Sequence, residues 1–163
     1  MRKPRSFVAS GHGSREEAER ALAALEERAR EGVVRLDDAV LVLKTAEGKV
    51  ELHQRHTLSI GGGVVAGGVA GVLAGVFLGL PIAGTVVGMA SGGSFSLLDR
   101  GIDDARMKRL GRELEPGHAA LCALVGEADW PLLRERMRPF AGELLAAELA
   151  PEAEAALARS DDA

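Results

Sequence analysis

Residues 58–98 read LSIGGGVVAGGVAGVLAGVFLGLPIAGTVVGMASGGSFSLL, a stretch of 41 residues without Asp, Glu, Lys, Arg or His. The sequence on either side of it holds all 20 basic and all 24 acidic side chains of the 163-residue chain. Such an uneven distribution indicates two different environments within one chain. We therefore divide the chain into a first polar segment (1–57), an inserted apolar segment (58–98) and a second polar segment (99–163).

Glycines recur at every fourth residue of the apolar segment, in two registers on either side of Leu80-Pro81. They are Gly63, Gly67, Gly71, Gly75 and Gly79, followed by Gly84, Gly88 and Gly92. A glycine inside a helix costs about 1 kcal/mol relative to alanine, so this spacing is favoured where bare helix faces pack closely. The pattern predicts a hairpin of two helices, about 59–79 and 82–98, that self-associates through these glycines.

The length of each predicted arm suits a membrane. About 20 residues at a rise of 1.5 Å give roughly 30 Å, close to the thickness of the hydrocarbon core. A hairpin returns both ends to one side, where His53, Arg55, His56 and Arg100 flank it. We expect membrane lipid as a partner, a homo-oligomer, and a cytoplasmic domain with both termini cytoplasmic. The alternative is a soluble homo-oligomer whose hairpins form a buried apolar bundle.

The two polar segments carry alternating strand and helix patterns, which predict an α+β fold. We expect strands at 6–9, 33–44, 50–55 and 118–126, with helices from Ser14 to Gly32 and over 103–115. This order predicts a ferredoxin-like antiparallel sheet with a split βαβ arrangement and 118–126 as a buried central strand. A helix from Asp129, an edge strand within 142–149 and a short helix at 151–159 are expected as a C-terminal αβ(α) extension.

The turn after the first predicted strand is a candidate ligand-binding site. His12 lies between Gly11 and Gly13, just before the helix that begins at Ser14. A helix N-terminus attracts anions, so a ligand-binding or enzymatic domain using this turn is a further alternative. A turn and helix cap also explain these residues fully.

Other reactive side chains do not form a recognisable catalytic set. Cys122 lies in an apolar run, where cysteine behaves as a small hydrophobic residue, and as the single cysteine it excludes an internal disulfide. His53 and His56 with Asp37 and Asp38 suit a metal poorly, because an extended strand points the two rings to different faces. A net charge of −4 and 3% aromatic residues argue against nucleic acid as a partner. We therefore assign no catalytic residue, cofactor or metal ligand and do not expect an enzyme.

Several linked segments resemble a known family. They are LDDAV (36–40) through GKVELHQ (48–54), the glycine hairpin, GIDD (101–104) and LEPGHAAL (114–121). In this order, over nearly the whole chain, they resemble the bacterial and archaeal family called domain of unknown function 1269. The resemblance implies a membrane-associated protein with a hydrophobic hairpin in an α+β domain and no assigned reaction. The GHGS sequence at 11–14 matches no motif of the family, so a site there would belong to this chain.

Overall fold

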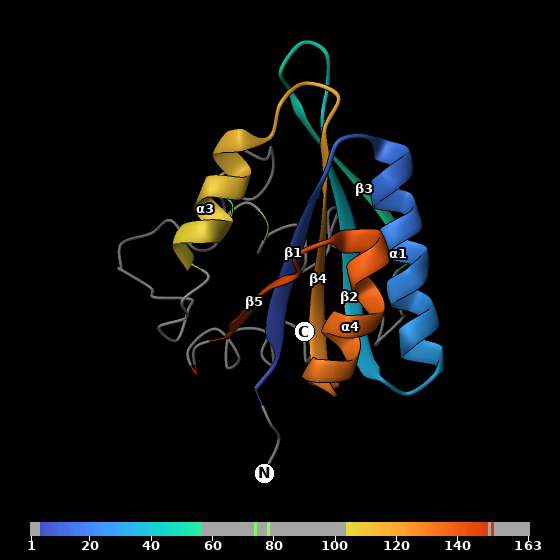
Figure 1. The fold of residues 1–163 in the computed structure, drawn as a ribbon. Coiled ribbons are helices and arrows are strands. Elements are labelled where there is room, and N and C mark those ends of the chain that lie inside the picture. Colours follow the sequence, from blue (N-terminus) through green and yellow to red (C-terminus); the bar gives the residue numbers. More distant parts are fainter. Residues whose placement is uncertain (1–3, 57–73, 75–77, 79–103, 150, 152–163) are drawn as a thin grey trace, which may run out of the picture.

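The computed structural model describes residues 4–56, 74, 78, 104–149 and 151 (Figure 1). Within these residues it is an α+β fold with a five-stranded antiparallel sheet and three helices. The strands are β1 (Ser6–His12), β2 (Val34–Lys44), β3 (Val50–His56), β4 (Ala119–Ala128) and β5 (Leu145–Glu148), and the helices are α1 (Arg15–Arg30), α3 (Asp104–Glu113) and α4 (Trp130–Ala141).

The strand order across the sheet is β3-β2-β4-β1-β5, and every neighbouring pair is antiparallel. β4 therefore splits the β1-α1-β2 unit, as expected for 118–126 as the central strand. β1 in turn splits the β4-α4-β5 unit. The expected edge strand within 142–149 is confirmed as β5, which pairs with β1 from Ser6 to Ala9.

The structure corrects the expected C-terminal extension. α4 and β5 are integral to the sheet layer, because β5 pairs with the N-terminal strand and α4 packs against α1. The strand added at the outside is instead β3, which pairs only with β2. The expected helix at 151–159 lies outside the described residues except for Pro151.

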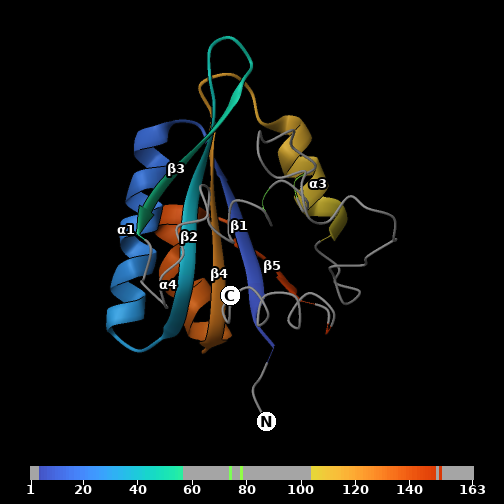
Figure 2. The same cartoon turned by 180° about the vertical axis from the view of Figure 1, so that it is seen from behind.

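The strands alternate their side chains between two apolar faces, as the two-residue period of a strand requires. We call the side covered by α1 and α4 the helix face. Its buried strand residues are Val8, Val34, Leu36, Ala39, Leu41, Leu43, Ala119, Leu121, Ala123 and Val125. We call the other side, where α3 lies, the insertion face. Its buried strand residues are Phe7, Ala9, Val40, Val42, Ala120, Cys122, Leu124, Leu145 and Ala147. Figures 1 and 2 show α3 on the opposite side of the sheet from α1 and α4.

Local sequence explains where α1 begins and ends. The Ser14 side chain accepts a hydrogen bond from the Glu17 backbone N–H at 3.2 Å, which confirms the predicted cap. Glu17 differs from the usual capping box, because its carboxylate accepts from the Gly13 N–H rather than from the cap residue. Gly32 follows the helix with a φ of +80°, a conformation that glycine adopts without the strain of a Cβ.

Candidate functional site

The insertion face is the part of the fold to which the apolar segment is attached. Two residues of that segment are described, Ala74 and Leu78, and both are helical and buried. They belong to one apolar cluster with Val40 and Val42 of β2 and with Met107 of α3. Both described residues of the apolar segment are therefore covered by the insertion face.

Gly111 of α3 lies against the backbone of Leu78. A Cβ built on Gly111 would lie 1.9 Å from the carbonyl oxygen of Leu78 and 2.8 Å from its carbonyl carbon. Those atoms belong to the backbone and cannot rotate away as a side chain can. The missing side chain at 111 therefore permits close backbone contact, which is the use of glycine predicted for the apolar segment itself.

The chain leaves and re-enters the sheet layer at about the same height. His56, the last described residue before the apolar segment, is opposite Ala39, which is opposite Ala123 in β4. Leu110 of α3 contacts Gly11, which is opposite Ala120. Six helical residues from Leu110 back to Asp104 cover about 9 Å, or roughly three strand residues. Because α3 runs opposite to β4 (Figure 1), Asp104 also lies near the height of Ala123.

The predicted oligomerisation residues, Gly63, Gly67, Gly71, Gly75, Gly79, Gly84, Gly88 and Gly92, lie outside the described residues, as do both predicted membrane helices apart from Ala74 and Leu78. Among the residues that are described, no helix is both long and apolar enough to cross a bilayer.

The His12 turn is occupied by contacts within the chain. His12 and Ser10 are both buried, and His12 Nε2 lies 2.8 Å from Ser10 Oγ. The Gly13 N–H donates to the Glu17 carboxylate at 3.1 Å, and the Glu17 N–H donates to Ser14. An anion arriving at this helix N-terminus would meet a carboxylate and two donors already in use. The geometry favours a structural role for His12.

Burial lowers the pKa of His12 below its ordinary value of 6.5, against a smaller raising effect of the Glu17 carboxylate. The native state thus holds His12 neutral, while the unfolded chain binds a proton at a higher pH. We expect the free energy of unfolding to be greatest above about pH 7 and to fall as the pH drops through the ordinary histidine range. Urea unfolding at about pH 7.5 and about pH 5.5 measures this difference.

The matched variants for this pH effect are His12→Gln and His118→Gln. The first should lose most of the pH dependence between the two conditions, and the second, at a half-exposed histidine, should keep it. Equal pH dependence in the native chain and in His12→Gln would contradict the assignment.

The other candidate side chains, Cys122, Asp37 and Asp38, are buried or held by contacts within the fold. Cys122 is fully buried, and burial raises the pKa of its thiol, so it carries little thiolate. The Asp37 carboxylate pairs with Arg35 at 3.1 Å and lies 3.9 Å from Arg5. The Asp38 carboxylate accepts from the Ala39 N–H at 2.9 Å. The described residues contain no group of three or more acidic, histidine or cysteine side chains placed to hold a metal ion.

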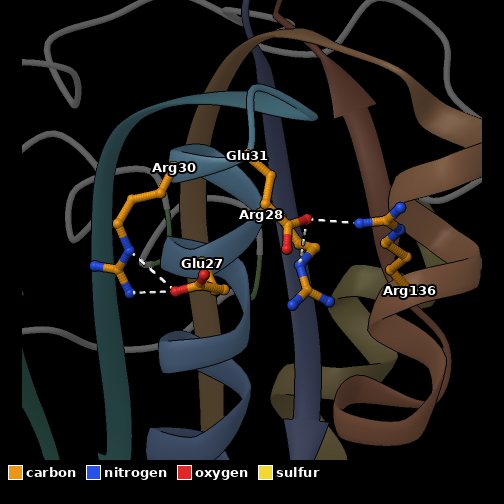
Figure 3. A network of polar contacts seen from close by, with 5 residues as sticks. All are labelled: Glu27, Arg28, Arg30, Glu31 and Arg136. Atoms are coloured by element: carbon orange, nitrogen blue, oxygen red, sulfur yellow. Dashed lines mark hydrogen bonds and ion pairs between the residues drawn. The ribbon is translucent and has the colours of Figure 1, made fainter.

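Five charged residues on the outer surface of the helix face form a group of contacts (Figure 3). Arg136 of α4 donates to the Glu31 carboxylate at 2.7 Å, which joins α4 to the end of α1. Arg30 donates to Glu27 twice, at 3.0 and 2.8 Å. Arg28 Nε lies 3.2 Å from the same Glu31 oxygen, but without hydrogen-bond geometry. The Arg136–Glu31 contact joins the two helices, and the other two pairs lie at the C-terminal end of α1.

The basic face of α3 is a feature that the sequence predictions above do not include. The helix buries Met107 and Gly111, Leu114 just after it is also buried, and it exposes Arg106, Lys108, Arg109 and Arg112. A helical wheel over 103–115 would have shown the basic face. Beside α3, a cleft of about 500 Å³ opens between Arg109, Ser10 and Glu143.

The structure thus defines a class: an α+β domain with an antiparallel sheet, helices on both faces and an apolar insertion between β3 and α3. Residues 64–160 match the family model described as Protein of unknown function (DUF1269). The chain belongs to this family, which confirms the resemblance, although the matched range omits β1, α1, β2 and β3. No curated protein and no solved structure matches the chain.

Proposed function

We propose that this chain is a membrane-anchored, self-associating structural or interaction module without enzymatic activity. In this proposal residues 58–98 enter a bilayer as a helical hairpin, and the α+β domain stays on the cytoplasmic side. The observation that carries it is the run of 41 residues without an ionisable side chain, long enough for two helical passes. Ionisable groups are costly in hydrocarbon, and their complete absence over this length suits lipid.

The fold supports this proposal through the two attachment points. His56 and Asp104 lie near one height of the sheet, so a hairpin that leaves and returns on one side requires no rearrangement of the strands. We also propose that the domain has the ferredoxin-like strand order. Its β5-β1-β4-β2 strands, with α1 and α4 on one face, are in the order of two interlocked split βαβ units. β3 is then an added edge strand that leads into the insertion.

One observation favours the soluble alternative. Ala74 and Leu78 are buried in the same apolar cluster as the insertion face of the sheet. An apolar segment that packs on protein can be shielded from water without lipid, and neighbouring copies could complete the shield. A soluble assembly with a dry interior of hairpins is therefore the second candidate.

Fractionation of the expressed full chain separates these two candidates. An integral anchor should keep the protein in the membrane pellet through high-salt and alkaline washes, with release only by detergent. A soluble assembly should instead appear in the supernatant as one large species by sedimentation. Release by salt or alkali would refute the anchor, because a hairpin held by apolar burial does not respond to either wash.

Self-association through the glycines is tested with a double substitution. Gly71→Leu with Gly75→Leu fills two consecutive positions of the glycine register and should dissociate the oligomer, since small residues permit the close approach of helices. Val72→Leu with Val76→Leu has the same spacing and is the matched control, and it should leave the oligomer intact. The measurement is the mass of the protein in detergent. An unchanged mass for the glycine variant would disprove the zipper.

A further inference from the structure

α3 has the highest proportion of Arg and Lys among the helices and strands of the described chain. Four of its ten residues are Arg or Lys, and two are acidic. All four cations are exposed. The formal charge of α3 is +2, as is that of α4, while the chain as a whole has a formal charge of −4.

The cations of α3 point away from the sheet. At 3.6 residues per turn, Lys108, Arg109 and Arg112 fall within an arc of about 100°, on the side opposite Met107 and Leu114. Met107 and Leu114 are buried in the insertion-face cluster. The three cations have no ion pair within the described part of the chain, whereas Arg106 pairs with Glu143. Exposed cations of this kind are available to an external anion.

The position of α3 indicates which anion. The helix begins at Asp104, six residues after the apolar segment ends at Leu98, and it lies on the opposite side of the sheet from α1 and α4 (Figure 2). The paired charges of Figure 3 lie on the opposite face. If residues 58–98 enter a bilayer, α3 is at the membrane surface, and its cations are at the height of lipid headgroups.

We infer that the exposed face of α3, formed by Lys108, Arg109 and Arg112, binds the headgroups of anionic lipids and orients the sheet domain on the membrane. This inference rests on the proposed membrane anchoring. It gives the domain an electrostatic contact in addition to the apolar one, as juxtamembrane basic clusters do. Each cation near an anionic surface strengthens binding about fivefold, so three together give about 100-fold.

The test uses the full chain with vesicles of phosphatidylcholine alone and vesicles in which about a quarter of the lipid is phosphatidylglycerol. The variant is Lys108→Gln, Arg109→Gln, Arg112→Gln. Its matched control removes three exposed cations elsewhere, Arg20→Gln, Lys49→Gln and Arg138→Gln. Co-flotation gives the ratio of binding to the two kinds of vesicle, and an alkaline wash of the floated vesicles measures anchoring separately.

A position-specific readout shows whether α3 itself is near lipid. Ala105 is exposed and lies in the middle of the basic arc, so Ala105→Cys can carry a fluorophore. Ala23→Cys on α1 is the far-side control. Cys122 is fully buried and stays unlabelled in the folded protein. Spin-labelled lipid then quenches a fluorophore that lies close to the bilayer.

We expect quenching at position 105 and not at 23 in anionic vesicles, reduced by salt because exposed charges are screened. The triple α3 variant should lose this quenching, with the binding ratio lowered about 100-fold, while the control triple keeps both. An anchored protein whose quenching at 105 is absent or insensitive to the α3 variant would overturn the inference and leave the anchor standing. Binding lost on alkaline wash but dependent on α3 would overturn the anchor alone. No association with either vesicle would overturn both.

Discussion

Alanine at position 111 should destabilise this protein, although a glycine-to-alanine change inside a helix normally stabilises by about 1 kcal/mol. The reason is the Leu78 carbonyl oxygen, which lies 1.9 Å from where the new Cβ would be. Either the apolar segment moves away from α3 or α3 shifts on the sheet. Overpacking of this kind costs about 1–3 kcal/mol, more than the gain in helix propensity. Urea unfolding of Gly111→Ala and the native chain gives the difference.

Gly11→Ala is the matched control for this substitution. Its Cβ would lie 2.5 Å from Leu110 Cδ1, the far end of a flexible side chain that can rotate. We expect the free energy of unfolding to change by less than about 1 kcal/mol. The two variants then differ mainly in whether the atom next to the new Cβ can move away. A stabilised Gly111→Ala would show that Leu78 does not occupy this position in solution. The same measurement in detergent reports whether the contact persists when the apolar segment is in a membrane-like phase.

Phe7→Ala should lower the free energy of unfolding by about 3–5 kcal/mol, the largest single effect we expect from a core truncation. Phe7 is fully buried on the insertion face, where β1 is flanked on both sides. It is opposite Leu124 of β4 and Ala147 of β5, so the change opens a cavity where three strands meet. Packed strands on both sides restrict collapse into that cavity, and the cavity cost adds to the lost burial.

Phe140→Ala removes the same side chain from α4, where Phe140 is 43% exposed. It should change stability by no more than about 0.5 kcal/mol. Urea midpoints and slopes of the two variants are compared with those of the native chain. A small effect at Phe7 would mean that the insertion face is not closed over this residue in solution.

The features predicted from sequence were those with a local cause. Ser14 was identified as a helix cap because a hydroxyl before an amphipathic run satisfies a free backbone N–H. The buried run from Ala119 was identified as a central strand because a continuous apolar segment of this length needs cover on both faces. Gly48, with a φ of +83°, is in the turn that the sequence placed between two strands.

The strand order was harder to predict, because pairing joins residues far apart in the chain. The sequence shows α4 and β5 following β4 but not that β5 returns to pair with β1. That pairing depends on the free edge of β1 and on apolar surface between α1 and α4, which exist only once the first units have folded. For the same reason the sequence did not reveal the occupied His12 turn, where buried Ser10 and the Glu17 carboxylate converge.

The sequence by itself determined the class of the chain: a charged α+β domain divided by an uncharged, glycine-patterned segment, with membership of its family. These features depend on the composition and on the spacing of residues along the chain, which can be read from the sequence directly. Only the tertiary structure decided which strand is central, which face carries α3, and that Gly111 meets Leu78. Those features depend on the register and packing of distant segments, and it is this packing that turns the cations of α3 away from the sheet.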